Sequence, residues 1–251
     1  MIIMKNKSIF HVEKNSLSET FNEKTKIEKY DVFDENFNYP LSWKIVHFKE
    51  YPRFKKYKFK ITNLSNLDFQ KLLKQRSSKR EFVKRSLSFS EVSNILYWSA
   101  GMKKDFTRFY PSAGGRYPLE VYIVALNVES LEQGIYHFNV KKNFLELILK
   151  GNFIEEIFRL SGNQEWVKDC GIVILISAVF GRTKIKYGER GYRYILMEAG
   201  HLAQNLYLVS EALNLGCCAI GGFLDDEINK LLDIDGKKES VIYLCGIGEK
   251  L

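Results

Sequence analysis

The segment from Tyr192 to Asn214 carries the strongest helical pattern in the chain, and it limits the folds that the chain can adopt. Apolar side chains recur through it at helical spacing and cover more than one side of the predicted helix: Ile195, Leu196, Ala199, Leu202, Ala203, Leu206, Val209, Ala212 and Leu213. A helix that is apolar on several sides must be buried, either in a large core or against a second subunit. Gly216 follows where a C-terminal cap belongs.

The chain is long enough to supply such a core. Its 251 residues, 45% of them hydrophobic, should bury roughly 70% of the surface that the unfolded chain exposes. Residues 1–65 are polar, charged and aromatic with little periodicity, so we expect an N-terminal extension that wraps the body or a partner. Residues 66–251 are predicted to form the main domain.

Short apolar runs and turn residues predict the other elements of this domain. The helix at 91–100 begins with a capping box formed by Ser88 and Glu91 and ends at Gly101. Further helices are expected at 67–74, 153–160 and 225–232. Strands are expected at 119–126, 135–138, 144–149, 172–180, 217–223 and 241–246, and the second and third of them should form a hairpin.

Two features bear on the cellular compartment. The longest apolar run, 171–180, is about half the length of a membrane span, and the first residues turn polar before a signal peptide could form. The four cysteines, Cys170, Cys217, Cys218 and Cys245, show neither a C-x-x-C pair nor metal-ligand spacing. We therefore expect a cytoplasmic protein with buried thiols, no membrane span and no metal site.

A formal net charge of +8 favours anionic partners without choosing among them. In residues 48–60 aromatic rings alternate with lysine and arginine, as a surface that stacks bases and neutralises phosphates would require. The other interpretation is an extended segment whose rings pack on the body while its lysines stay in water. We favour the second interpretation, without nucleic acid as a partner, because no recognisable nucleic-acid module accompanies the segment.

Residues 74–82 place four cations, two serines and one acid just before a predicted helix. Arginine offers a planar fork of donors that matches phosphate oxygens, and serine hydroxyls complete such a shell without adding charge. Arg76, Ser77, Ser78 and Arg80 are therefore candidates for a phosphate site. Taken alone, a basic run this short is usually solvated surface.

Three further motifs follow the basic segment. They are Pro111–Pro118 with the sequence P-S-A-G-G-R-Y-P, the Lys186–Tyr187 pair ahead of the long helix, and the glycine-bearing turn at 216–223. In this order and at these spacings the chain resembles the flavin-dependent nitroreductase superfamily. Within it the chain is similar to the SagB-type (McbC-like) branch, the thiazole/oxazole dehydrogenases that mature ribosomally made peptides.

The resemblance implies a fold, an activity and partners. The fold would be α+β and nitroreductase-like, a mixed, mainly antiparallel sheet flanked by helices, in a homodimer with FMN at the subunit interface. The activity would be FMN-dependent oxidation of thiazoline or oxazoline rings to thiazoles or oxazoles in a precursor peptide, as in bacteriocin biosynthesis. Reduced flavin would be returned by oxygen, and the enzyme would act beside a cyclodehydratase in a complex.

The resemblance also assigns the FMN-binding residues. Arg76, Ser78 and Arg80 fall on the R-x-S-x-[RK] signature that binds the phosphate and the ribityl end. The full predicted set is Arg76, Ser77, Ser78, Arg80, Pro111, Ser112, Ala113, Gly114, Arg116, Ile220, Gly221 and Gly222. Glycines at 221 and 222 let backbone N–H groups approach a flat ring. The family usually carries proline and glutamate in that turn, so the residue that contacts flavin N5 stays open.

Lys186 and Tyr187 match the Lys-Tyr pair of these dehydrogenases and are the predicted catalytic residues. Aromatising an azoline ring removes a hydride from one carbon and a proton from its neighbour, and a protein base must take the proton. A lysine can serve where its surroundings lower its pKa from about 10.4, and an adjacent tyrosine can orient or relay the proton. Lys184 is a nearby competitor, and without the family match a solvated lysine would be the default.

Other functions remain open at this point. A general NAD(P)H-dependent nitro- or quinone reductase would share the flavin site, and a non-catalytic scaffold would hold FMN only to fold. Glu198 and His201 form an E-x-x-H half-motif, but a di-iron bundle needs a second copy that the sequence lacks. Hydrolase, Rossmann and P-loop motifs are also absent from the sequence.

Overall fold

The computed structural model describes residues 17–26, 40–64 and 67–251. The chain separates into two units, residues 1–40 and residues 41–251, and the first contributes helix α1 (Leu17–Lys24). Every other element belongs to the second unit. The predicted boundary at residue 65 stays a prediction, and residues 41–64 lie in the same unit as the sheet. What was expected of residues 1–16 and 27–39 lies outside the described residues.

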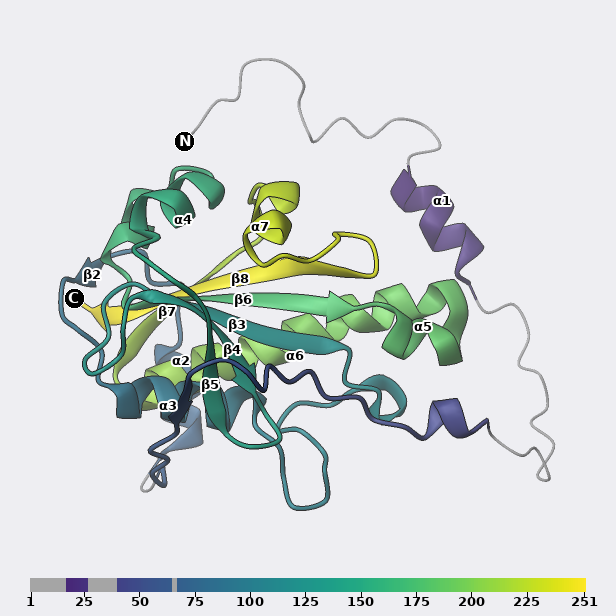
Figure 1. Cartoon of the computed structure of the whole chain (residues 1–251), viewed down its shortest axis with the longest axis horizontal. Helices are drawn as coiled ribbons and strands as arrows, with labels where there is room; N and C mark the ends of the chain where they lie inside the picture. Colours follow the sequence, from purple (N-terminus) through teal and green to yellow (C-terminus); the bar gives the residue numbers. More distant parts are fainter. Residues whose placement is uncertain (1–16, 27–39, 65–66) are drawn as a thin grey trace, which may run out of the picture. The chain divides into compact units, whose positions relative to one another are not determined.

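An antiparallel sheet forms the centre of the second unit (Figure 1). In the described residues its strands follow the order β1-β5-β4-β3-β6-β8-β2, and β7 also pairs with β8. The strands are β1 (Lys56–Lys58), β2 (Phe82–Val83), β3 (Leu119–Ala125), β4 (Gly134–Asn139), β5 (Phe144–Lys150), β6 (Ile172–Val179), β7 (Leu215–Ile220) and β8 (Glu239–Lys250). Parallel pairing occurs in two isolated bridges, Ser78 with Cys217 and Leu87 with Val128.

Helices cover both faces of this sheet (Figure 1), which explains why its central strand β3 is buried along its whole length. Strand β3 alternates its side chains: Val121 and Ile123 enter one core, and Tyr122 and Val124 enter the other. The first core includes α3 (Phe89–Ala100) and α6 (Gly191–Ala212), and the second includes α4 (Ile154–Leu160) and α7 (Asp225–Leu231). The predicted α+β class, with a mainly antiparallel sheet flanked by helices, is confirmed.

The long helix α6 packs on the sheet and on α3, as its apolar pattern predicts. Its end differs from the prediction. The helix stops at Ala212, and Asn214 rather than Gly216 takes the left-handed conformation with φ of 60°. Gly216 lies inside β7, where an added Cβ would come within 2.8 Å of the Phe82 ring. The cap assigned to Gly216 was therefore wrong, because this glycine serves close packing in the sheet.

Of two short helices in the second unit, one was predicted and the other was not. Helix α2 (Phe69–Gln75) precedes the basic segment close to the helix expected at 67–74, whereas helix α5 (Gly181–Tyr187), which follows β6, was not foreseen from the sequence. Within α5 only Thr183 is buried, so the segment has no apolar period to detect. Tertiary hydrogen bonds hold it instead. No helix among the described residues combines the length and apolarity needed to traverse a bilayer.

Residues 48–60 behave as an extended segment that packs on the body. The Phe59 ring stacks on Phe138 with centroids 5.1 Å apart, and the Tyr57 ring meets Tyr136 edge-on at 5.6 Å. Lys55 pairs with a carboxylate of the loop between β3 and β4, 2.5 Å from Glu132 Oε1. These contacts favour the packing interpretation over a nucleic-acid surface, because the rings are used internally.

We expect Ser88→Ala to destabilise the protein by about 1 kcal/mol, because the capping box of α3 would lose its side-chain acceptor. Ser88 Oγ accepts the Glu91 N–H at 3.1 Å, and Glu91 accepts the Ser88 N–H at 2.6 Å. Urea unfolding measures the change. Ser77→Ala, which removes an exposed hydroxyl outside any helix cap, is the control and should change stability by less than about 0.5 kcal/mol. Equal losses would contradict the cap.

Candidate functional site

The turn at Pro111–Pro118 and the Lys186–Tyr187 pair, far apart in sequence, meet at Gly114. Gly114 lies in a short 3-10 turn, Ala113–Gly115, with φ of 59°. A Cβ added there would come within 2.5 Å of Tyr187 Oη and 3.0 Å of Lys186 Nζ. The left-handed backbone and the missing Cβ together permit this approach. Lys186 and Tyr187 are both half-buried at the end of α5.

Two arginines fasten α5 to this turn by reciprocal bonds to main-chain carbonyls. Arg116 is buried; its Nε donates to Arg182 O at 2.8 Å and its Nη1 to Trp43 O at 2.7 Å. In return, Arg182 Nη1 donates to Tyr117 O at 3.3 Å. The observed bonds of Arg116 are thus made to the protein, and its predicted contact with FMN stays a prediction.

A chain of buried charges supports Arg182 from the sheet. Arg182 Nη2 lies 2.6 Å from Glu120 Oε1, and the other Glu120 oxygen lies 3.0 Å from His137 Nε2. His137 Nδ1 lies 2.9 Å from Glu146 Oε2. Burial opposes a charge on the His137 imidazole, but the hydrogen bonds that the ring donates to the two carboxylates outweigh it and raise the pKa of His137. The charges of this chain therefore balance inside the protein rather than in water.

Glu198 of α6 holds the same turn from the other side. Its Oε2 lies 2.6 Å from Ser112 Oγ, and Ser112 Oγ accepts the Tyr117 N–H at 2.8 Å. The Glu198 side chain is 2% exposed, and its Oε1 has no hydrogen-bond partner among the described residues. Burial raises the pKa of Glu198 to about 8. The carboxyl is therefore mostly neutral near pH 7.

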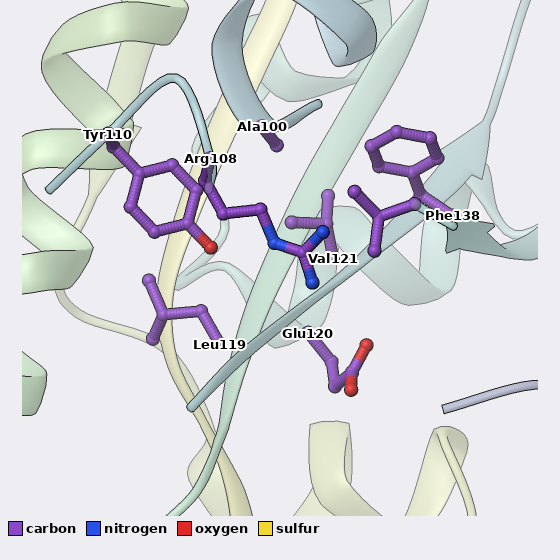
Figure 2. Close-up of a pocket in the computed structure, with 8 residues that line it drawn as sticks. Ala100, Arg108, Tyr110, Leu119, Glu120, Val121 and Phe138 are labelled. Atoms are coloured by element: carbon purple, nitrogen blue, oxygen red, sulfur yellow. The ribbon is translucent and has the colours of Figure 1, made fainter. Parts of the chain in front are cut away.

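Beside the turn lies an open groove of about 640 Å³, lined by Lys103, Asp105, Thr107, Arg108, Phe109, Tyr110, Pro111, Ser112, Gly115 and Tyr117. Arg108 also lines a small cavity of about 10 Å³ together with Tyr110 and Glu120 (Figure 2). Its guanidinium packs between the Phe48 and Tyr117 rings, with centroids 5.2 and 5.3 Å away. The groove thus has a polar and aromatic wall at the turn.

The basic segment forms a second cluster at the other end of α6. Ser78 Oγ lies 2.9 Å from Tyr207 Oη, and the Arg76 guanidinium lies over the Tyr207 ring at 5.3 Å. Tyr207 Oη also accepts the Ala219 N–H at 2.8 Å. Ser77, Ser78 and Arg80 are exposed, and in the described part of the chain no carboxylate pairs with Arg76 or Arg80. Their charges are available to an anion.

Strand β7 brings its end to this second cluster. Ser78 bridges Cys217, and the Lys79 N–H donates to Cys217 O at 3.1 Å. Ile220 ends β7 as a buried residue, and Gly221 and Gly222 follow as exposed backbone. A Cβ at either glycine would meet nothing within 4 Å, so this stretch is open to a flat ligand.

The structure therefore gathers the predicted residues into two clusters. Pro111, Ser112, Ala113, Gly114 and Arg116 lie with Lys186 and Tyr187, while Arg76, Ser77, Ser78 and Arg80 lie beside the strand that leads to Ile220, Gly221 and Gly222. Lys250 pairs with Glu211 at 2.7 Å. Among the described residues no group of three metal-ligating side chains occurs.

Sequence reasoning missed the residues that support these clusters. Arg182, Glu120 and His137 carry no motif, and Tyr207 looked like one more residue of the long helix. Glu198 did carry a signal, because an acid on the apolar side of a buried helix needs a partner. It was considered only as half of a metal motif.

Comparison with known protein families and proteins identifies relatives of this chain. The family model described as "Nitroreductase family" matches residues 73–249. MJ1384 of Methanocaldococcus jannaschii, which carries a provisional nitroreductase name, is 34% identical over 193 residues, covering 76% of this chain and 96% of that protein. The microcin B17-processing protein McbC of Escherichia coli is 29% identical over 174 residues, 66% of this chain and 64% of its own length.

Solved structures share the fold. A provisionally named nitroreductase from Anabaena variabilis superposes with a TM-score of 0.78 at 27% identity over 93% of this chain; this chain spans about half of that one, 47%. The Escherichia coli microcin synthetase McbBCD, solved with truncated pro-MccB17 bound, gives a TM-score of 0.62 at 23% identity, covering 92% of this chain and 86% of the matched chain.

We expect Arg182→Met to destabilise the protein by about 3–5 kcal/mol, because Glu120 would keep a buried charge without its guanidinium partner. The two side chains are 9% and 5% exposed. Chemical denaturation measures the loss.

Arg159→Met is the matched control for this change. Arg159 pairs with Glu227 at the same 2.6 Å, but both side chains are about half exposed, so the loss should stay below about 1 kcal/mol. Similar losses in the two variants would show that the buried pair does not hold α5.

Proposed function

The chain belongs to the nitroreductase family, and we propose that it is an FMN-dependent dehydrogenase of the SagB-type branch that oxidises thiazoline or oxazoline rings in a ribosomally made peptide. One observation carries the proposal: the P-S-A-G-G-R-Y-P turn touches Lys186 and Tyr187 at Gly114. A reductase that only passes hydride between small molecules has no need of a paired base at that turn. The similarity to a microcin-processing protein supports the choice of a peptide substrate.

The residues present fit FMN. Arg76 and Arg80 offer unpaired guanidiniums and Ser78 a hydroxyl to a phosphate, while Gly221 and Gly222 leave main-chain N–H groups accessible to a ring edge. FMN, when bound, supplies an acceptor for the hydride that leaves the azoline ring. No part of this fit requires a residue outside the predicted set except Tyr207, which orients Ser78 and Arg76.

Lys186 takes the ring proton in this proposal, and Tyr187 orients the base or relays that proton. Lys186 Nζ lies 5.6 Å from the centre of the Trp43 ring, and the Tyr187 ring packs edge-on against Tyr194 at 5.1 Å. These aromatic neighbours limit the positions that the two side chains can adopt. The hydride goes to the cofactor and the proton to Lys186, so the ring loses two hydrogens and becomes aromatic.

We also propose a homodimer in which each FMN site takes residues from both copies. Glu198, beside the first cluster, and Tyr207, beside the second, lie nine residues apart on α6, or about 14 Å at 1.5 Å per residue. In the first two turns of α6, Tyr192, Leu196 and Met197 are 37%, 44% and 58% exposed. An apolar row beside two separated half-sites favours a second copy over solvent.

A larger complex and a cytoplasmic location complete the proposal. The McbBCD synthetase is a multi-protein complex with a precursor bound, which supports a cyclodehydratase partner here. The expected wrapping role of residues 1–65 belongs to the same proposal.

We expect Arg76→Met to weaken FMN binding about 10- to 100-fold, because one charge-assisted hydrogen bond to the phosphate is lost. Riboflavin, which lacks the phosphate, should bind both proteins within about threefold. Flavin fluorescence titration measures both constants, and Arg53→Met, which removes an exposed arginine of the segment before β1, is the control. A parallel loss of riboflavin affinity would refute the assignment to the phosphate.

We expect Lys186→Ala to slow azoline oxidation by about 10²- to 10⁴-fold without loss of the flavin spectrum, because the general base is removed. Mass spectrometry of a synthetic azoline peptide measures the loss of two hydrogens. Lys184→Ala is the control, because Lys184 already pairs with Glu189 at 2.8 Å, and it should keep the rate.

Other outcomes select the alternatives. Fast flavin reduction by NAD(P)H with no peptide oxidation would identify a general nitro- or quinone reductase. A complex whose peptide product is unchanged by Lys186→Ala and Tyr187→Ala would identify a scaffold. A colourless protein that binds no FMN when FMN is supplied in excess would reject the proposed function altogether.

A further inference from the structure

Ser112 Oγ already has two of its three hydrogen-bond positions filled from inside the protein. It accepts the Tyr117 N–H at 2.8 Å and lies 2.6 Å from Glu198 Oε2. A serine hydroxyl has one hydrogen to donate and two lone pairs to accept with. The direction of the bond to Glu198 therefore decides what Ser112 can offer to anything else.

The two protonation states of Glu198 give opposite results. If Glu198 is ionised it can only accept, so the Ser112 hydrogen must point at Oε2 and is used up. If Glu198 is neutral it can donate to Ser112 Oγ, which then accepts twice and keeps its own hydrogen for a third partner. Ser112 is half-buried and lines the groove of about 640 Å³, so a ligand in that groove is the available third partner.

The surroundings of Glu198 favour the neutral state. Its Oε1 is buried without a partner among the described residues, which costs far more for a carboxylate than for the carbonyl of a neutral acid. The charged or titratable groups that interact with it are Arg108, which favours ionisation, and Tyr110, both from the segment that leads into the turn. Burial opposes the charged carboxylate and outweighs both the hydrogen bond with Ser112 and the charge of Arg108, which each favour ionisation, so the pKa of Glu198 rises to about 8.

We infer that Glu198 is a positioning residue that keeps Ser112 as a hydrogen-bond donor toward the groove, so that the site selects a ligand with an acceptor atom at that point. This rests on the proposed function, because the ligand is taken to be FMN, whose ring and tail carry carbonyl and hydroxyl oxygens. Glu198 acts through Ser112 and touches no ligand itself. The donor is present below the pH at which Glu198 ionises and is withdrawn above it.

The test compares wild type with Glu198→Gln in flavin fluorescence titrations of FMN at several values between pH 7 and pH 9.5. Glutamine keeps the shape of the neutral acid, and its amide donates to Ser112 Oγ at every pH. Wild-type affinity should fall about 3- to 10-fold across this range as one neutral hydrogen bond is lost. Glu198→Gln should match wild type at pH 7 and show no such fall.

Two further variants separate this role from a structural one. Ser112→Ala in the Glu198→Gln background should bind about 3- to 10-fold more weakly at all pH values, because the donor itself is gone. Glu227→Gln, an exposed acid on α7, is the control and should keep the wild-type pH dependence. Ionisation of FMN affects every variant alike, so the difference between the curves belongs to Glu198.

The same pH fall in Glu198→Gln as in wild type, or no fall in wild type, would overturn the inference. Failure of wild type to bind FMN would instead reject the proposed function. In that case urea unfolding still reports the state of Glu198. A group whose pKa rises from about 4.5 to about 8 on folding contributes stability that is lost as pH rises between those values, and Glu198→Gln should remove that loss. A pH-independent difference between the two proteins would then reject a neutral Glu198.

Discussion

The close approach of Gly114 to Lys186 and Tyr187 depends on two arginines, Arg116 and Arg182. Arg116 donates to the main-chain carbonyl of Arg182, and Arg182 donates to the main-chain carbonyl of Tyr117, the residue that follows Arg116. Thr183 is the one fully buried residue of helix α5, so hydrophobic packing contributes little to fixing its place. Instead, Arg116 and Arg182 tie α5 and the turn together through carbonyl oxygens, and Glu120 anchors Arg182 to the sheet. Directional bonds of this kind define a position more narrowly than apolar contact does, which suits a pair of residues that must face a reacting atom.

The sheet and the long helix α6 hold the rest of the candidate site in place. Strand β3 supplies Glu120 as well as apolar side chains to both cores, so the chain of buried charges is built into a fully buried strand of the sheet. Helix α6 contacts the turn through Glu198 and the basic segment through Tyr207. One continuous helix therefore sets the distance between the two clusters, and neither cluster can shift along it independently.

Helices and strands with a periodic apolar pattern could be predicted from the sequence. The polar residues that support the candidate site could not. The runs at 119–126 and 172–180 and the capping box at Ser88 carry local signals strong enough to give β3, β6 and α3 nearly to the residue. The position of helix α5 and the roles of the supporting residues Arg182, His137 and Tyr207 depend on partners distant in sequence, which no local pattern reveals. At Gly216, in contrast, a local pattern suggested a role that the tertiary structure does not support. A glycine after a helix resembles a cap, but the Phe82 ring that excludes a Cβ there comes from a remote strand.

The four cysteines, all buried and unpaired, have a practical consequence. Burial raises the pKa of Cys170, Cys217 and Cys218, so these sulfurs stay protonated and poorly nucleophilic while the fold is intact. Cys217 and Cys245 lie on the paired strands β7 and β8. Alkylation of Cys217 and Cys245 should therefore require the centre of the sheet to open, so the rate of alkylation reports how often the native protein opens there.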